Sequence, residues 1–328
     1  MKRNLLLGLI AISMPMVWAG CGDKDEDEFA RREESRGAEP RHKLAMKYSP
    51  GAWKTVQTMD QTVGVGDRTQ KSEMTMHMLT RVSQPGPDGT KTATMRFTRM
   101  VAKQPGLHMD SDRIAPNNGG RNPAERAMAS VMTALLGAEI QMRVSAKNEI
   151  TEVKGLSAMW DRMAAGMGPT ERQLLNAMKE GLNDDTMRRL ADMSYMLPDE
   201  PVGKGAIWHG DLDLPIPIVG AMEMQLEMEL LRFEEDGGRK TAVIAVTGRA
   251  SSDEPTTTDM GGGKVRVTRM RLDQTGTMRF DVEQGMVTRQ QVKQTGQIDM
   301  EATRGGETKE QTVELDQTIT TAVTPAEE

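Results

Sequence analysis

The sequence feature that most constrains the fold is the stretch 221–231, in which apolar and polar residues alternate. Its apolar positions are Met222, Met224, Leu226, Met228 and Leu230. Glutamate or glutamine occupies each position between them. Because successive side chains of a β-strand point to opposite faces of a sheet, this pattern predicts a half-buried strand with an apolar inner face and an acidic outer face.

Similar alternation recurs along most of the chain and predicts an antiparallel sheet. We expect strands at residues 53–65, 71–82, 90–101, 139–145, 149–154, 206–214, 221–234, 239–250, 264–282, 286–302 and 308–323. On the third of these we expect Ala93, Met95 and Phe97 to face inward. The Pro-Gly-Pro-Asp-Gly sequence at 85–89 predicts a hairpin turn, because Pro fixes φ and Gly permits positive φ. In 264–282 the inward parity changes after Val267, which predicts a β-bulge near Thr268 and Arg269.

Helical patterns separate some of these strands. Asn122 and Pro123 form an N-cap and first-turn pair that opens a helix, which continues to Leu136 and is closed by Gly137. Further helical patterns cover residues 156–164, 170–182 and 185–196. Pro198 ends the last of them.

The two halves of the chain share a faint repeat. Residues 73–76 (Glu-Met-Thr-Met) and 223–226 (Glu-Met-Gln-Leu) occupy equivalent places, and each follows a strand that starts near Gly and Trp. Chance similarity between Met- and Thr-rich strands is the alternative explanation. The predicted fold is α+β and mainly antiparallel β. It is a long-stranded curved sheet or half-barrel made of two related β-meander halves, with a helical insertion between them.

The N-terminus carries the signals of export. Lys2 and Arg3 precede an apolar segment at 5–12, which is too short to span a membrane and suits a signal peptide. The sequence Trp-Ala-Gly-Cys at 18–21 then resembles the lipobox of bacterial lipoproteins, with Trp18 where Leu is usual. This resemblance implies cleavage before Cys21 and lipid attachment there, including palmitate. An ordinary signal peptide with a coincidental cysteine is the alternative.

Cys21 is the only cysteine, so a disulfide within the chain is excluded. Gly22 follows it, rather than the Asp that lipoprotein sorting rules associate with the inner membrane, so the resemblance implies the periplasmic face of the outer membrane. Residues 22–43 are densely charged and predict a flexible tether. The expected organisation is a signal peptide at 1–20, the lipidated Cys and tether at 21–43, a first meander half with helical segments at its C-terminal end at 44–197, and a second half at 198–328. The two halves form one domain or two.

Several turn and strand-start residues resemble those of a known family. They are Tyr48-x-Pro50-Gly51, Asp110-Ser111 and Leu197-Pro198-x-x-Pro201-Val202-x-x-Gly205-x-x-Trp208. Together with the lipobox they resemble an uncharacterised bacterial lipoprotein family whose domain has no known function. More loosely, the strands look like the half-barrels of periplasmic lipoprotein carriers and mycobacterial lipid-binding lipoproteins. These resemblances imply a fold and an exported lipoprotein, and they assign no catalytic residue.

The amino-acid composition indicates which class of partner is excluded and which residues fill the core. The net charge is −6 and Lys and Arg form no basic block, which argues against nucleic acid as a partner. Aromatic residues make up 3% of the chain whereas Met occurs 29 times, so Met fills much of the core.

The inward positions of the Met-rich strands are candidates for ligand-facing or core residues. They are Met74, Met76, Met78, Met95, Phe97, Met222, Met224, Leu226 and Met228. Flexible thioether side chains suit a closed core or an adaptable binding surface. A copper site at Met74, Met76 and Met78 is a weaker alternative, because same-face neighbours on a strand lie about 7 Å apart.

No motif has the specificity of an active site. The four His residues are scattered without metal-ligand spacing, and Gly261-Gly262-Gly263-Lys264 lacks the other residues of a P-loop. Asp-Gln-Thr recurs at Asp60, Asp273 and Asp316, and we interpret it as convergent strand surface. We therefore expect no enzyme, metal or cofactor. The expected protein is anchored to a membrane through its lipid and binds an apolar ligand or an envelope protein. The alternative is a structural or assembly lipoprotein of the envelope with a closed Met-rich core.

Overall fold

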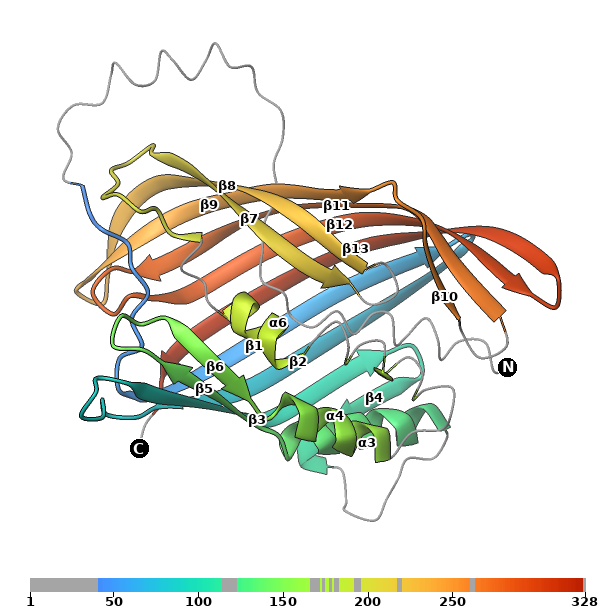
Figure 1. The fold of residues 1–328 in the computed structure, drawn as a ribbon, viewed down its shortest axis with the longest axis horizontal. Helices are drawn as coiled ribbons and strands as arrows, with labels where there is room; N and C mark the ends of the chain where they lie inside the picture. The colour runs from blue at the N-terminus through green and yellow to red at the C-terminus, as the bar shows by residue number, and fades with distance from the viewer. Residues whose placement is uncertain are drawn as a thin grey trace, which may run out of the picture.

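The computed structural model describes residues 41–113, 123–165, 172, 175–176, 179, 183–191, 196–216, 220–259 and 263–326. Within these residues the chain forms one curved antiparallel sheet of 13 strands, which is not closed into a barrel (Figure 1). The strands are β1 (Gly51–Val65), β2 (Arg68–Val82), β3 (Lys91–Gln104), β4 (Leu107–Asp110), β5 (Glu139–Val144), β6 (Ile150–Lys154), β7 (Ile207–Ile216), β8 (Gly220–Asp236), β9 (Arg239–Ser252), β10 (Thr256–Asp259), β11 (Gly263–Asp281), β12 (Met286–Arg304) and β13 (Glu307–Pro325). The helices are η1 (Ser111–Arg113), α3 (Pro123–Leu136), α4 (Leu156–Ala165) and α6 (Asp184–Ala191).

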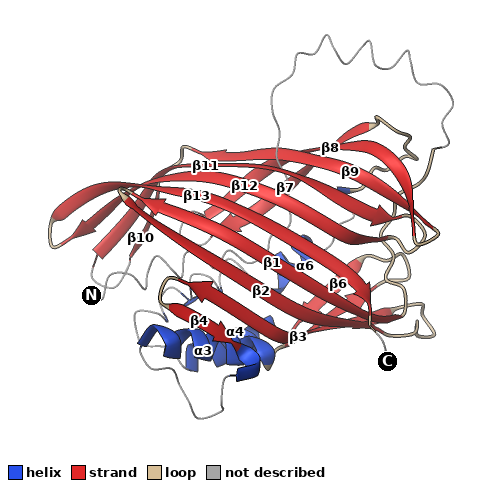
Figure 2. Cartoon of the chain, turned by 180° about the vertical axis from the view of Figure 1, so that it is seen from behind, coloured by secondary structure: helices blue, strands red, loops and turns tan. Residues whose placement is uncertain are grey.

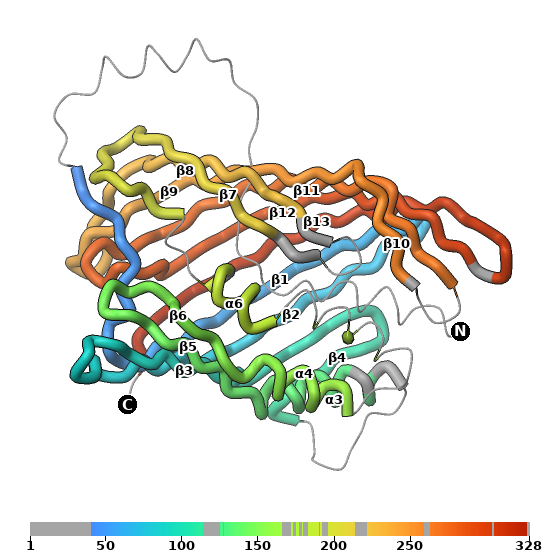
Figure 3. The backbone as a smooth tube through the Cα atoms, viewed as in Figure 1, coloured from blue at the N-terminus to red at the C-terminus, as the bar shows by residue number. Residues whose placement is uncertain are grey.

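Two meanders lie side by side in this sheet. One runs β1-β2-β3-β5-β6, the other runs β7-β8-β9-β11-β12-β13, and the pairing of β1 with β13 joins them. The tube in Figure 3 shows the consequence, since the blue start and the red end of the body are neighbours at the centre of the sheet. The prediction of a mainly antiparallel, curved sheet with helices between strand groups is therefore confirmed.

The helices lie mostly at one end of the sheet. α3 packs against α4, β3 and β4, and α6 contacts β6. Seen from behind in Figure 2, α6 lies beyond the strands, on the face that Figure 1 turns to the viewer. Among the described residues, no helix is both long enough and apolar enough to cross a membrane.

Most predicted elements are present with longer strands. The helix from Pro123 to Leu136 is confirmed, and the bulge in β11 falls between Val267 and Arg269 as predicted. The short strands β4 and β10 lie in segments for which no strand was predicted. The predicted helix at 170–182 lies mainly outside the described residues, and so do residues 1–40 with Cys21.

The bulge in β3 was not predicted. His77 pairs with Arg99 but Met78 pairs with Phe97, so Thr98 has no partner on β2. The inward parity of Ala93, Met95 and Phe97 therefore continues at Met100 and Ala102. Contacts from the next segment fix this bulge, because the Ser111 hydroxyl accepts the Met100 N–H at 2.9 Å.

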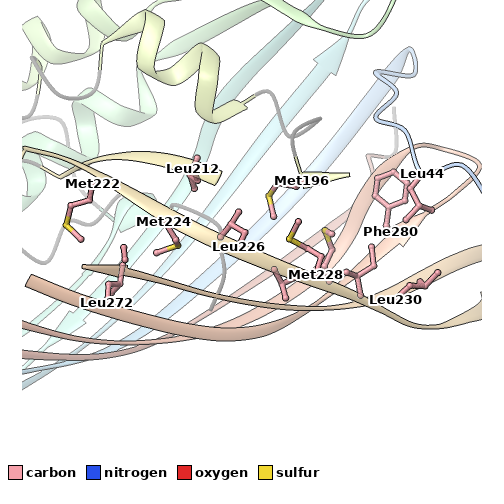
Figure 4. Packing of buried hydrophobic residues seen from close by; sticks show 14 of the residues in the cluster. Leu44, Met196, Leu212, Met222, Met224, Leu226, Met228, Leu230, Leu272 and Phe280 are labelled. Carbon is pink, nitrogen blue, oxygen red and sulfur yellow. The ribbon is translucent and has the colours of Figure 1, made fainter. Parts of the chain in front are cut away.

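The apolar core gathers at the two ends of the sheet. The larger cluster lies on β7, β8, β9 and β11, where Leu44 and Met196 cover Met228 and Phe280 (Figure 4). Smaller clusters lie on β2, β3, β5 and β6 with α3 and α4, and include Met76, Met132 and Trp160.

Two glycines of the sheet lie where the backbone of the neighbouring strand leaves no room for a side chain. A Cβ on Gly248 would lie 2.2 Å from the backbone oxygen of Gln225, and one on Gly276 would lie 2.4 Å from that of Gln291. Such contacts exclude any other residue without a shift of the backbone.

Candidate binding surface on the inner face of the sheet

We call the face that carries the buried strand side chains the inner face, and Met59, Met76, Met228, Met278 and Phe280 all belong to it. The outer face carries charged and hydroxyl side chains. Its ion pairs include Arg249–Asp273 at 2.7 Å, Lys293–Asp316 at 2.9 Å and Arg266–Glu301 at 3.2 Å. The two faces therefore have the opposite polarities that strand alternation predicts.

The nine predicted site residues lie on the inner face in two separate groups. Met74 and Met76 pack with Met100 and Met132, while Met78 pairs with Phe97. Met95 and Phe97 also pack against the cluster of Trp160.

The second group is Met222, Met224, Leu226 and Met228, all buried in the larger cluster. Strands β1, β13, β12, β11 and β9 separate it from the first group. The structure therefore does not bring the nine residues into one site.

The predicted copper alternative has no additional support near its three methionines. Met74 and Met76 lie among apolar side chains of β3, β4 and α3, which are typical surroundings of core methionines. Within the described part of the chain, no group of three or more His, Cys, Asp or Glu residues could hold a metal ion.

Between the two Met groups lies a feature that sequence reasoning missed. Gln61 of β1, Gln317 of β13, Gln294 of β12 and Gln274 of β11 face one another in register. Each is between 2% and 5% exposed. We call these four residues the glutamine ladder.

The glutamine ladder is a directed chain of hydrogen bonds. The Ser72 hydroxyl donates to Gln61 Oε1 at 3.4 Å, and Gln61 Nε2 donates to Gln317 Oε1 at 3.3 Å. Gln317 Nε2 donates to Gln294 Oε1, and Gln294 Nε2 donates to Gln274 Oε1. All the amides thus point the same way, and the chain ends at Gln274 Nε2, which has no hydrogen-bond partner. Aligned hydrogen bonds of this kind polarise one another in a low-dielectric interior.

A second polar row lies four residues along each strand and consists of Gln57, Thr321 and Gln290. Gln57 Nε2 donates to the Thr321 hydroxyl at 3.3 Å. Gln57 Oε1 and Gln290 Nε2 are buried without a partner. The side chains of Met59, Ile319 and Val292 form an apolar row between the two polar ones.

These buried amides are costly unless something satisfies them. An unsatisfied buried donor or acceptor costs about 1–3 kcal/mol, and most buried polar groups in native proteins have partners. Three free amide atoms on one face, at Gln274, Gln290 and Gln57, therefore call for an explanation. The two polar rows and the apolar row between them contain no ionisable side chain, so the surface they form is uncharged.

The sequence did contain a signal for the glutamine ladder. Gln61, Gln274 and Gln317 are the central residues of the three Asp-Gln-Thr repeats, and each shares the parity of apolar inward neighbours. Our interpretation of the repeats as strand surface is correct for Asp273 and Asp316, which form ion pairs on the outer face. It is wrong for the glutamines, because residues next to each other on a strand point to opposite faces.

The motifs behind the family resemblance make structural contacts. The Tyr48 hydroxyl donates to the Ala191 carbonyl at 3.3 Å, and Trp208 Nε1 donates to the Met196 carbonyl at 2.9 Å. Val202 forms an isolated antiparallel bridge with His42. These contacts hold the segments before β1 and β7 in place, which is why such residues specify a fold.

Asp110, whose carboxyl pKa is strongly lowered, has a structural role. The Arg99 guanidinium donates to Asp110 Oδ1 at 3.2 Å and to Oδ2 at 2.7 Å. These bonds, the Asp112 backbone N–H and the positive charges of Arg99 and Arg113 lower the pKa of Asp110 to about 2. Asp110 thereby fixes the bulged part of β3, away from the glutamine ladder.

Comparison with known proteins places the chain in a family. The model of a family of unknown function, DUF6263, matches residues 88–287. The matched region contains the Asp110-Ser111 motif and the segment from Leu197 to Trp208, but not Tyr48-x-Pro50-Gly51. No curated protein matches the chain.

Likeness to solved structures is weak. Lipovitellin aligns with a TM-score of 0.40 and 10% identity over 86% of this chain, which spans only 26% of the lipovitellin chain. OccK5 of Pseudomonas aeruginosa gives a TM-score of 0.20 and 8% identity over 84% of this chain and 99% of its own. A DUF1329 protein of Desulfovibrio piger gives 0.17 and 7% over 84% and 85%. Scores this low carry no functional argument. The family match, in contrast, covers more than half of the 328 residues, so the chain belongs to DUF6263, a family of unknown function.

Proposed function

We propose that the protein is an exported lipoprotein, anchored through a lipid on Cys21, which binds an apolar ligand on the inner face of its sheet. The observation that carries the binding function is the concentration of buried Met and aliphatic side chains on this face, against an outer face of ion pairs. Export and anchoring rest on the sequence alone, through the apolar segment at 5–12 and the lipobox-like residues before Cys21.

Methionine supports a binding role because its unbranched thioether adapts to ligands of different shapes. Met222, Met224 and Met228 lie on β8 in the larger cluster, and Met270 and Met278 of β11 belong to the same cluster. The strands β6 and β7 at the two ends of the sheet are not paired with each other. An unclosed sheet can change its curvature without breaking strand pairing, which gives a ligand a way to reach these side chains.

The alternative is a structural or assembly lipoprotein of the envelope with a closed Met-rich core. The specific observation in its favour is that Met224, Met228, Leu230 and Phe280 have no exposed surface in this structure. In that case the inner face is the core alone, and the outer face or a sheet edge contacts an envelope protein.

The test uses full-length protein with Cys21→Ser, which keeps the export signal but has no thiol to lipidate. The protein is purified from the exported fraction and its mass is compared under native and denaturing spray conditions. A small molecule lost on denaturation, extracted and identified, supports the binding role and names the ligand class. A ligand-free mass that also stays unchanged after incubation with decane contradicts it. Cross-linking of the lipidated protein to one envelope protein would then favour the alternative.

A further inference from the structure

The free end of the glutamine ladder adjoins the larger Met cluster. Gln274 pairs in register with Gly248 on β9, which has no side chain to accept its amide hydrogens. A Cβ on Gly248 would lie 3.0 Å from Leu226 Cδ2, so the Leu226 side chain lies beside this end of the ladder. A buried hydrogen-bond donor and an apolar, Met-rich surface thus meet on neighbouring strands.

We propose, building on the proposed function, that the ligand is an uncharged amphiphile whose carbonyl oxygen accepts a hydrogen bond from Gln274 Nε2. Its hydrocarbon chain lies over Leu226 and Met224, which are buried in this structure and become accessible when the sheet changes its curvature. A neutral acyl ester has this chemistry, with an acceptor oxygen at one end of an apolar chain. A few placed polar groups in an apolar surface are the usual means by which a protein orients such a ligand.

The direction of hydrogen-bond donation along the glutamine ladder favours a ligand that accepts a hydrogen bond. Each amide from Gln61 to Gln294 donates towards β11, so Gln274 accepts one bond and is left with free N–H groups. Polarisation along the chain strengthens the last donor. A ligand oxygen at this position would complete the chain of hydrogen bonds.

The glutamine ladder carries no charge among its described residues, and this determines which polar group of a ligand it can bind. Gln61, Gln317, Gln294 and Gln274 are neutral, and their in-register neighbours on the inner face are Ser72 and Gly248. A buried carboxylate or phosphate without a cation is strongly unfavourable. The surface should therefore select a neutral ester over the corresponding acid anion.

A purely structural role is the competing explanation, since buried polar residues can fix strand register. Such a role requires the hydrogen bonds between the four glutamines, but it does not require a free donor at the end. It also predicts that the protein does not prefer a ligand with a carbonyl oxygen to a hydrocarbon without one. Ligand selectivity therefore separates the two explanations.

The experiment measures binding of three ten-carbon probes to the Cys21→Ser protein after removal of bound lipid. The probes are methyl decanoate, decane and decanoate at pH 8, and binding is read from displacement of N-phenyl-1-naphthylamine fluorescence and from native mass spectra. We expect methyl decanoate to bind about three- to tenfold more tightly than decane, the factor that one neutral hydrogen bond contributes. Decanoate should bind more weakly than the ester.

Gln274→Met is the decisive variant because Met has nearly the shape of Gln without its amide. It should lose the ester preference and bind the ester no more tightly than decane, because the buried ester oxygen would have no donor. Gln290→Met, in the second polar row, is the matched control and should keep the ester preference. If Gln274→Met does not fold, the carbonyl stretch of ¹³C-labelled methyl decanoate on the unsubstituted protein provides the test, since a hydrogen bond lowers its frequency relative to hexane.

The outcomes separate the two proposals. Equal binding of ester and decane, tighter binding of decanoate, or loss of preference in Gln290→Met instead of Gln274→Met overturns the assignment but leaves the proposed function standing. A bound ester whose carbonyl frequency matches that in hexane does the same. Failure of all three probes to bind overturns the proposed function itself.

Discussion

Gln61 donates a hydrogen bond to Gln317 across the junction of β1 and β13, where the two meanders meet. Both side chains are buried, at 4% and 2% exposure. The junction of the two halves is therefore held by an amide pair as well as by backbone pairing. Because Gln61, Gln317 and Gln294 each hydrogen-bond to two neighbours, removing one of them breaks two bonds.

Replacing Gln317 by Met should destabilise the protein by about 1–3 kcal/mol, because Gln61 Nε2 and Gln294 Oε1 would lose their buried partner. Urea unfolding followed by circular dichroism measures this. The matched comparison is the fourfold variant with Met at 61, 274, 294 and 317. Its free energy of unfolding should be closer to that of the unsubstituted protein than the value for Gln317→Met is. The reason is that replacing all four amides by apolar groups of similar shape leaves no ladder amide without its partner. A fourfold variant much less stable than the single one would contradict this account.

Asp110→Asn should reduce stability at neutral pH and have little effect near pH 2. The Arg99 hydrogen bonds place the pKa of Asp110 at about 2 in the folded protein, below the usual value near 3.9 in an unfolded chain. The carboxylate therefore stabilises the fold above about pH 4, and this contribution is lost as the pH falls towards about 2. Unfolding midpoints in urea at pH 7, 4 and 2.5 measure the difference between variant and parent.

The control for this pH dependence is Asp253→Asn, whose exposed carboxylate pairs with Arg269 at 3.2 Å. Exposed ion pairs contribute little, so its effect should be small at every pH. If Asp110→Asn lowers stability equally at pH 7 and pH 2.5, its effect does not come from the charge.

Gly248→Ala should destabilise the sheet by about 1–3 kcal/mol, since the added Cβ has to displace the Gln225 backbone. Gly64→Ala is a matched strand control, because its Cβ would make only an ordinary contact of 3.5 Å with Glu314. Alanine there should be neutral or slightly stabilising. Thermal unfolding of both variants provides the comparison, and equal loss of stability would exclude close strand approach as the cause.

Cys21→Ser should release the protein from the membrane fraction, because the variant has no thiol to which a lipid can be attached. Mass spectrometry of the mature N-terminus and labelling with a palmitate analogue check this. Export itself should persist, since residues 1–20 are unchanged. Membrane retention of Cys21→Ser, or a mature N-terminus elsewhere than residue 21, would contradict the lipoprotein prediction.

Local patterns predicted the strands well because period-two alternation is a property of neighbouring residues. The bulge in β11 could be predicted since it changes parity among apolar residues, from Val267 to Met270. The bulge in β3 was missed because Val101, which ends the predicted strand, is apolar and keeps the parity of Phe97, so the change at Met100 is masked. The shift at Thr98 also depends on contacts from Ser111. β4 and β10 are only four residues each, too short for a recognisable period.

The candidate site was less accessible to sequence reasoning. Met222, Met224 and Met228 were predicted as inner residues from alternation, and they are buried. The glutamine ladder depends on the register among β1, β13, β12 and β11, which involves residues as far apart as Gln61 and Gln317. No local pattern fixes that register. Gln also has a low prior for burial, which favoured the interpretation as surface.

The pairing of β1 with β13 also bears on how the protein is made. β13 is synthesised after the other twelve strands, yet it belongs at the centre of the sheet rather than at an edge. Until it emerges, β1 and β12 each present a row of unpaired backbone groups, and such rows recruit strands of other chains. The two meanders therefore cannot be joined until almost the whole chain has been synthesised. A chain cut short before β13 would be two half-sheets with exposed edges, and it would aggregate rather than work as a smaller version of the protein.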